Sequence, residues 1–296
     1  MSLHPRMPRV TVAVPSYNQG RFLEATLRSI FSQPLPIEVM VADGGSTDDT
    51  LQVIERWRHR LTWFRTAPDK GQAAAINEAI GHARAPLVCW LNSDDVFLPG
   101  GLSALVAAIE ADPSTAVAYG DCLRLDEQGR VIGSFRAGPL TALGLSRRCM
   151  IPQPASIVRR KAWEGVGGLD ENLHLALDYD LWWRLQRAGA QFDYIGVKVA
   201  AARLHPAAKT LRQAREMYAE AKSVVRRHHG SVPFIWWLKQ PVSIGMRKKG
   251  SVLQKVAQGL ERWAGRRSYH AQIPADSPGA GTGGKLALLP EAQRIG

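Results

Sequence analysis

The first part of the chain alternates between short apolar runs and longer segments with helical spacing. The run 9–15 is rich in β-branched residues and predicts a buried strand, and 37–42 predicts a second one. Between them, apolar residues recur every three or four positions over 21–33, which predicts a helix. The alternation continues with a helix ending near Trp57, a strand at 61–65, a helix at 72–83 and a strand at 86–91. This order predicts a Rossmann-like α/β fold, with a mostly parallel sheet flanked by helices.

Later segments are less regular. We expect a helix at 102–111, strands within 117–132 joined by the turn 126–129, and a helix at 179–188. A long charged helical region follows at 206–228, and the last 25 or so residues are rich in Gly, Ala and Pro. The pattern predicts an α/β domain over 1–205, a basic helical extension over 206–270 and a disordered tail over 271–296.

Composition restricts the class of protein. The 296 residues are 45% hydrophobic and 22% charged, which excludes disorder of the whole chain. No apolar run approaches the roughly 20 residues that cross a bilayer, and the N-terminus has no secretory signal, so we expect a cytoplasmic protein. The isolated Cys89, Cys122 and Cys149 suggest neither a disulfide framework nor a zinc site.

The positive charge is confined to the C-terminal third. The net charge is +12, of which residues 205–296 carry +11, from 16 Lys and Arg against 5 Asp and Glu. The neutral remainder argues against specific nucleic-acid binding. In the basic region, Trp236, Trp237 and Trp263 lie near cations, as in a segment that binds an anionic membrane surface; packing on the main domain is the alternative. A peripheral location at the inner membrane face is therefore one expectation.

Acidic residues dominate three expected strand ends. These are Asp43, the pair Asp94 and Asp95, and Asp178 with Asp180. Ligands of open α/β sheets lie at the carboxyl ends of the strands. Crowded carboxylates there indicate a cation or a proton-transfer task, and one carboxylate pair is typical of a Mg²⁺ or Mn²⁺ site that also holds phosphates.

The motifs at these positions resemble the nucleotide-sugar-dependent family-2 glycosyltransferases with the GT-A fold. The resemblance covers about residues 8–210. Five segments carry it, namely VTVAVPSYNQGRFLEATLRSIFSQ, VMVADGGSTDDT, DKGQAAAINEAI, VCWLNSDDVFLPG and QPASIVRRKAWEGVGGLDENLHLALDYDLWWRL. Their shared order makes the match more specific than a single motif.

For the donor nucleotide, the resemblance implies contacts at the first two strand ends. These contacts would be made by Pro15, Ser16, Tyr17 and Asp43, with loop packing or a simple turn as the alternative. Asp69, Lys70 and Asn77 fall where a second nucleotide loop is expected, although a solvated Asp-Lys-Gly turn is nearly as well supported.

The segment Asn92-Ser93-Asp94 takes the place of the family's Asp-x-Asp metal motif, with Asn replacing the first acid. The resemblance implies that Asp94 binds Mg²⁺ or Mn²⁺, that Asn92 and Ser93 lie at the ribose, and that Asp95 orients sugar or acceptor. His205 is a second expected metal ligand, with a packed histidine as the alternative. Helix capping by Asp94 or Asp95 is the alternative to their functional roles.

The segment Leu177-Asp178-Tyr179-Asp180 matches the family's later acidic motif, with Leu177 in place of the usual Glu. The resemblance implies that Asp178 is the general base. Capping of the following helix is the alternative for Asp178 and the favoured role for Asp180. Trp182 and Trp183 could border an acceptor pocket, but aromatic residues on a helix are more often in the core.

Together these features predict an inverting, metal-dependent glycosyltransferase of polysaccharide or glycolipid synthesis. Its donor would be a UDP-sugar, or else a GDP- or dTDP-sugar, and its acceptor a glycan or a lipid-linked sugar. The substitutions Asn92 and Leu177 leave open a catalytically weak nucleotide-sugar-binding or scaffold protein. The run 279–285 has P-loop spacing, but Leu286 replaces the required Ser or Thr and no strand precedes it.

Overall fold

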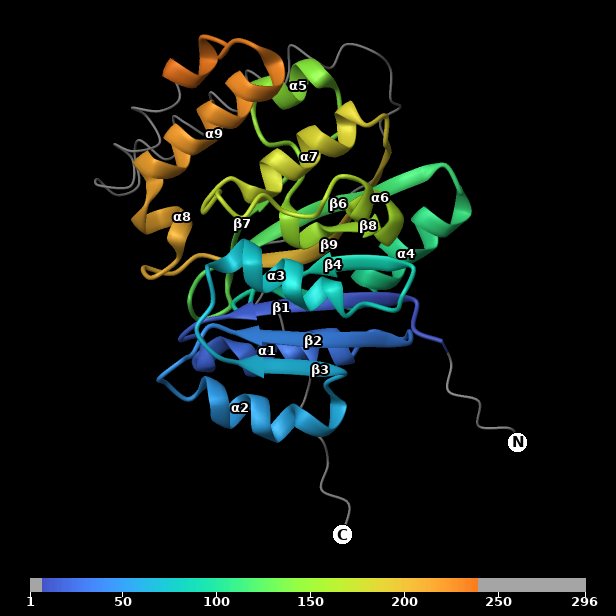
Figure 1. The fold of residues 1–296 in the computed structure, drawn as a ribbon, viewed down its shortest axis with the longest axis vertical. Coiled ribbons are helices and arrows are strands. Elements are labelled where there is room, and N and C mark those ends of the chain that lie inside the picture. The colour runs from blue at the N-terminus through green and yellow to red at the C-terminus, as the bar shows by residue number, and fades with distance from the viewer. Residues whose placement is uncertain (1–6, 239–296) are drawn as a thin grey trace.

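The expected alternation of strands and helices is present in the computed structural model, which describes residues 7–238 (Figure 1). The strands are β1 Val10–Ser16, β2 Ile37–Asp43, β3 Trp63–Thr66, β4 Leu87–Trp90, β5 Val96–Phe97, β6 Thr115–Leu125, β7 Val131–Phe135, β8 Ser156–Arg159 and β9 Gln191–Arg203. The α-helices are α1 Gly20–Phe31, α2 Thr50–Trp57, α3 Gln72–Gly81, α4 Gly101–Ala111, α5 Ala142–Arg147, α6 Arg160–Gly165, α7 Leu177–Arg187, α8 Lys209–Arg212 and α9 Ala214–His229. Two short 3₁₀ helices are η1 Arg58–Arg60 and η2 Gln153–Ala155.

All strands join one sheet in the order β3-β2-β1-β4-β8-β6-β9-β5, with β7 paired to β6. The β3-β2-β1-β4 half is entirely parallel, as the sequence predicts. The other half is mixed, because β8 is antiparallel to both β4 and β6 whereas β6 and β9 are parallel. The α/β fold class is confirmed, and the parallel character belongs mainly to the N-terminal half.

The parallel register brings the predicted strand ends together. Ser16 lies opposite Asp43 at the ends of β1 and β2, and Ala13 lies opposite Trp90 at the end of β4. Loops that leave β1, β2 and β4 therefore emerge at the same edge of the sheet. This edge carries most of the candidate site residues.

Helices cover both faces of the sheet, because alternate strand residues point to opposite sides. On one side, Val12 and Val14 of β1 pack in a cluster that includes residues of α1, α2 and α4. On the other, Ala13 packs in a cluster that includes residues of α3, α7 and α9. The two clusters fix the strand ends from both faces.

Helix α9 belongs to this second cluster rather than standing apart from the sheet. Its Val224 and Val225 are fully buried in the same cluster as Trp182 of α7, and α9 lies beside α7 in Figure 1. Trp236, beyond α9, donates from Nε1 to the carbonyl of Ser146 at 2.8 Å. The described start of the basic extension thus packs on the main domain.

The rest of the predicted extension, with Trp263, the tail and the P-loop-like run 279–285, lies outside the described residues. Within 7–238, the helices are too short or too polar to cross a membrane. A separate extension starting at 206 stays a prediction.

Candidate active site

The ends of β1 and β2 form the first part of the site. The amide of Gly44 donates to the carbonyl of Ser16 at 2.9 Å, which joins the two loops. The Asp43 carboxylate is fully buried and accepts hydrogen bonds from the amides of Gly45 and Ser46 at 3.1 and 3.0 Å. The Asp43 carboxylate therefore stabilises the turn that follows it, which is the structural alternative considered for this residue. Its contact with a nucleotide stays a prediction.

Beside this turn, three groups from different loops converge. A Cβ on Gly44 would lie 3.0 Å from Oδ2 of Asp69 and 3.3 Å from the Tyr17 ring. Tyr17 is 63% exposed, whereas Pro15 and Ser16 are buried. An exposed ring can stack on a nucleobase, and a carboxylate beside it can accept hydrogen bonds from the N–H groups of that base.

The Ser16 hydroxyl adds a polar group to this corner. Its Oγ is buried and has no hydrogen-bond partner among the described side chains and backbone. A buried hydroxyl without a partner is costly unless a ligand or water satisfies it. This supports a ligand position next to Ser16.

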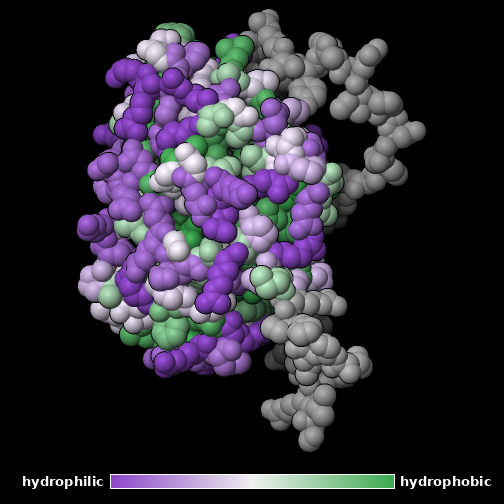
Figure 2. Space-filling view, turned by 45° about the vertical axis from the view of Figure 1, so that its right-hand side comes forward, coloured by the Kyte–Doolittle hydropathy of each residue, from purple (hydrophilic) through white to green (hydrophobic). Residues whose placement is uncertain are grey.

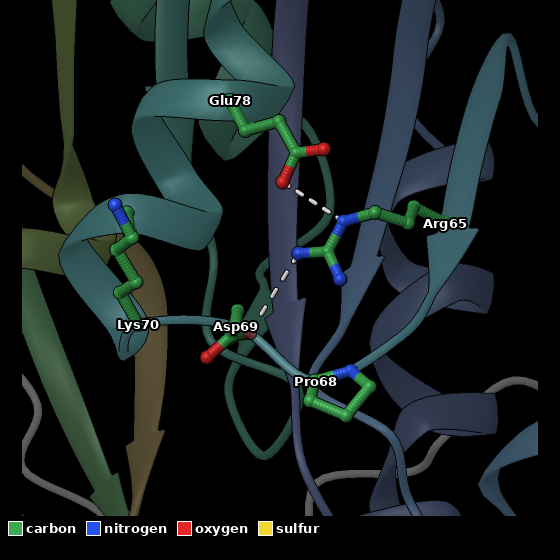
Figure 3. A pocket seen from close by; sticks show the side chains of 6 residues that line it. Arg65, Pro68, Asp69, Lys70 and Glu78 are labelled. Atoms are coloured by element: carbon green, nitrogen blue, oxygen red, sulfur yellow. Dashed lines mark hydrogen bonds and ion pairs between the residues drawn. The ribbon is translucent and has the colours of Figure 1, made fainter.

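An open hollow of about 320 Å³ continues from Asp69 along α3. Arg65 and Lys70 lie on opposite sides of it in Figure 3. The Arg65 guanidinium is held by Glu78 at 2.8 Å and lies 3.7 Å from Oδ2 of Asp69. The hollow thus combines fixed charges of both signs, which can bind a polar group of a nucleotide.

Asn77 does not join the predicted donor residues. Its amide donates to the carbonyl of Leu169 at 2.9 Å and to Glu171 at 3.1 Å, and its Oδ1 accepts from the Leu169 amide at 2.9 Å. These bonds tie α3 to the loop before α7. The structure gives Asn77 a structural position, and no described bond connects it to the strand-end loops.

The loop after β4 contains the segment Asn92-Ser93-Asp94, which takes the place of the Asp-x-Asp motif, followed by Asp95. Asn92 accepts from Gln72 at 2.8 Å and donates to Asp95 at 3.2 Å. Asp95 accepts from the amide of Arg203 at 3.0 Å. Burial, together with the charge of Asp94, raises the pKa of Asp95 well above its usual range.

Two details of this loop change the expected roles. The carbonyl of Ser93 accepts a hydrogen bond from the Thr26 hydroxyl at 2.9 Å, and Ser93 itself is only 3% exposed. Asp95 likewise faces the protein, where it fixes β9. Neither Asp94 nor Asp95 caps a helix, because β5 follows directly; Asp94 is the member of the group that remains available to a ligand.

Asp94 and His205 form the clearest candidate for a metal position. Their Oδ2 and Nε2 atoms lie 2.9 Å apart, although the residues are far apart in sequence. The His205 side chain is fully buried and that of Asp94 is 16% exposed. Within 7–238, no three His, Cys, Asp or Glu side chains form a complete metal site. One oxygen and one nitrogen fit Mg²⁺ or Mn²⁺ if phosphates and waters supply the other ligands.

Asp178 lies in the first turn of α7, two residues after the N-cap residue Ala176, and not at a strand end as expected. Its Oδ2 is 3.9 Å from the thiol of Cys149. Burial is the main reason that the pKa of Asp178 is raised to about 6. A carboxyl group with this pKa is ionised near neutral pH and can still accept a proton, as a general base must.

Asp180, two residues further in the same turn, has a structural environment, but the expectation that it caps the helix is wrong, because the N-cap residue is Ala176 and no described side chain caps this end. It is fully buried and bonded to Arg184 at 2.6 Å and to His228 at 2.8 Å. Burial opposes its ionisation, but the hydrogen bonds from His228 and Arg184 hold the pKa of Asp180 below its usual value. Trp182 and Trp183 of the same helix lie in the core, as their helical position favours.

Side chains without an expected role connect these parts. Lys209 of α8 donates to Gln72 at 3.1 Å, and Gln72 bonds Asn92. Gln153 lies on the other side of Asn92, at 3.4 Å, and also donates to the carbonyl of Trp90 at 2.7 Å. The spacing of Gln72 and Lys209 gives no sequence signal, because their partners come from distant segments.

Comparisons with known proteins bear on the family and the fold of the chain. The family model described as glycosyl transferase family 2 matches residues 11–130. The chain is 27% identical to the Escherichia coli chondroitin synthase, over 62% of this chain and 27% of that protein, so it spans about a quarter of the length of this relative. It is 29% identical to the succinoglycan biosynthesis protein ExoU of Rhizobium meliloti, over 74% of each chain.

Two solved structures share the fold. The mannosyltransferase PcManGT of Pyrobaculum calidifontis, solved with GDP-Man and Mn²⁺, has a TM-score of 0.60 at 22% identity and covers 89% of this chain and 81% of its own. S. aureus TarS, solved with UDP-GlcNAc, has a TM-score of 0.58 at 19% identity and covers 79% and 73%. The resemblance seen in the sequence is confirmed: residues 11–130 match glycosyl transferase family 2, and the relatives and solved structures support a glycosyltransferase of this family.

Proposed function

We propose that this protein is an inverting, divalent-metal-dependent glycosyltransferase of polysaccharide or glycolipid synthesis. It moves a sugar from a nucleoside diphosphate sugar to an acceptor hydroxyl. The contact between Asp94 and His205 carries this proposal, because it places an oxygen and a nitrogen donor together at the sheet edge where α/β folds bind nucleotides. The family match and the names of the relatives support the class of reaction.

The nucleoside lies against Tyr17, Ser16 and Asp69 in this proposal. Tyr17 stacks on the base, Asp69 accepts its N–H groups, and the unpartnered Ser16 hydroxyl bonds the ribose or base. Lys70, at the neighbouring hollow, attracts the negative nucleotide. UDP-sugars are our first choice of donor, since TarS binds UDP-GlcNAc, and GDP-sugars are the second, since PcManGT binds GDP-Man.

Asp178 performs the proton transfer. Its carboxylate takes the proton of the acceptor hydroxyl as that oxygen attacks the anomeric carbon. The bond between this carbon and the diphosphate oxygen breaks on the opposite face, which inverts the anomeric configuration. A pKa of about 6 keeps Asp178 mostly ionised at neutral pH, so the base is ready before the acceptor binds.

Asp94 and His205 would hold the cation, and Mg²⁺ or Mn²⁺ bound there would neutralise the negative charge of the donor's diphosphate. Asn92 and Asp95 keep the loop after β4 in place through Gln72 and Arg203. Only Asp94 would then supply a carboxylate from this loop. This explains how the motif can operate with Asn92 in the first position.

The test is release of nucleoside diphosphate and sugar transfer across a panel of nucleotide-sugars with Mn²⁺ or Mg²⁺. We expect activity that EDTA abolishes and that Asp94→Ala lowers by at least about a hundredfold. Asp112→Ala is the matched control, because Asp112 lies at the end of α4 and is exposed. Donor binding without any transfer by the wild type, with all acceptors supplied, would support the scaffold alternative instead.

A second proposal concerns the location of the enzyme. The apolar side chains of Leu143, Phe234, Trp237 and Leu238 are 51–72% exposed at the end of the molecule where Trp236 packs on α5. Arg147 at the end of α5 and Arg148 just after it are exposed, and Lys222 lies 4.2 Å from the Trp237 ring centre. We propose that these residues bind an anionic membrane surface, on which a lipid-linked acceptor would lie.

This membrane proposal is tested by sedimentation with vesicles that contain or lack anionic lipid. Replacing Phe234, Trp237 and Leu238 by Ser should remove binding to the anionic vesicles and leave the stability unchanged, because Trp236 is kept. Ser at Val131 and Ile132 is the matched control, since these side chains are exposed on β7. Equal binding by both variants would contradict the proposal.

A further inference from the structure

Glu220 of α9 makes an unusual set of contacts with the loop that leads into α7. Its Oε1 accepts hydrogen bonds from the amides of His174, Leu175 and Ala176, at 2.9, 2.8 and 2.8 Å. These are three consecutive backbone donors, and they come from a segment outside any regular element. One carboxylate oxygen thus fixes the path of the chain immediately before Leu177 and Asp178.

The position of this contact connects it to Asp178. Ala176 is the N-cap residue of α7, and its carbonyl accepts from the amide of Asp180 at 3.0 Å. Any movement of the 174–176 backbone would therefore shift the first turn of α7. Asp178 lies in that turn, so the location of its carboxylate depends on the loop that Glu220 holds.

Glu220 also acts on Asp178 through its charge. The groups that face Asp178 are Cys149 from the segment before η2, Tyr179 of its own helix and Glu220 of α9. Glu220 contributes a negative charge that adds to the effect of burial in raising the pKa of Asp178. Lys209 of α8 interacts with Glu220 and is the nearby cation.

We propose that Glu220 is a positioning residue of the transfer reaction: it fixes the 174–176 backbone and thereby sets the placement of the Asp178 carboxylate against the acceptor hydroxyl. The inference rests on the proposed role of Asp178. It also assigns to α9, the first long helix of the basic region, a part in catalysis that its sequence does not indicate.

The experiment compares Glu220→Ala and Glu220→Gln with the wild type in steady-state transfer over a range of pH. In Glu220→Ala the loop loses its anchor, so we expect kcat to fall roughly tenfold or more while the donor KM stays within about twofold. Glu220→Gln keeps an acceptor oxygen but loses the charge. It should retain more of kcat and move the acidic limb of the pH profile to lower pH.

The matched controls are Glu216→Ala and Glu216→Gln, because Glu216 is exposed one turn earlier on the same helix. Both should behave as the wild type. A purely structural role of Glu220 would lower the melting temperature and leave the pH limb of Glu220→Gln in place, which would overturn the inference. The pH profile of Glu220→Gln remains decisive if Glu220→Ala fails to fold.

Hydrogen exchange separates this inference from the proposed function, since it does not need turnover. The amides of 174–176 should exchange roughly tenfold faster in Glu220→Gln or Glu220→Ala than in the Glu216 variants. Unchanged exchange would overturn the role of Glu220 even in an active enzyme. Absence of transfer by the wild type, with faster exchange in the variants, would overturn the role of Asp178 as base instead.

Discussion

At the scale of single residues, the two acidic side chains of the α7 start are distinguished by their partners. Asp180 is bonded to Arg184 and His228, whereas the donors near the Asp178 carboxylate are the weak Cys149 thiol and backbone amides of the helix start. The first environment favours a permanently ionised carboxylate, and the second favours a group that exchanges a proton near neutral pH. This contrast gives Asp180 a structural environment and supports the proposed role of Asp178 as a base.

The pH dependence of transfer should report this environment of Asp178. The carboxyl group must be ionised to accept a proton, so kcat should rise with pH through about 6 and level off above it. Below that pH, the protonated fraction grows and the rate falls about tenfold per unit. A profile of kcat against pH at saturating substrates checks this. An acidic limb near the ordinary pKa of aspartate would contradict the raised pKa of Asp178 in the proposed base role.

At the scale of elements, helices α7 and α9 pack on each other and on one face of the sheet. Asp180 joins Arg184 on its own helix to His228 on α9, and its carboxylate is fully buried. Removing one partner from a buried ion pair leaves the other charge without compensation. The junction between these helices should therefore be sensitive to change at this position.

Asp180→Ala should lower the free energy of unfolding by about 3 kcal/mol or more. Because the pKa of Asp180 is below its ordinary value in the folded state, the wild type should lose this stabilisation as pH falls through that pKa. The difference between wild type and variant should therefore shrink in acid. Urea unfolding at neutral and acidic pH measures this difference, with Asp112→Ala as the exposed control. A difference in the free energy of unfolding below about 0.5 kcal/mol at neutral pH would be inconsistent with a structural ion pair.

The sequence predicts the elements whose signals are local. The strands of the parallel half and helices α1 to α4 follow from periodicity, and their boundaries differ from the expectation by one or two residues in most cases. Strand β9 was not predicted, because its first eight residues are largely exposed and lack alternation. Its place between β6 and β5 depends on pairing with segments far away in the chain.

The candidate site shows the same limit. Motif resemblance implies the roles of Asp94, His205 and Asp178, and the contact of Asp94 with His205 brings two of these residues together. It does not predict that Asn77 bonds the loop before α7, nor that Glu220 contacts Ala176 from 44 residues away. Such pairings depend on tertiary packing, which no local pattern specifies.

At the scale of the whole molecule, the basic C-terminal part and the α/β part share one hydrophobic cluster. Val224, Val225 and Trp236 are buried in it, together with Trp182 of α7. Figure 2 shows one face covered largely by hydrophilic side chains, with smaller apolar areas between them. Removal of α9 would expose part of this core to water.

A fragment ending at residue 205 should therefore fail to fold cooperatively, whereas one ending at 238 should keep the fold. Circular dichroism melting of the two fragments checks this, with the full chain as reference. The shorter fragment loses the buried side chains of α9, each worth about 1.5 to 3 kcal/mol of burial. A cooperative transition of the 1–205 fragment near that of the full chain would instead favour an independent domain with a separate extension.

The proposed role of Asp178 as the base of a sugar transfer has a direct test. It is the transfer rate of Asp178→Asn measured beside its donor affinity, with the donor identified by the nucleotide-sugar panel. We expect a loss of kcat of at least about a hundredfold with donor affinity within about twofold of the wild type, because Asn keeps the shape of the side chain but accepts no proton. Transfer at the wild-type rate by Asp178→Asn would contradict it.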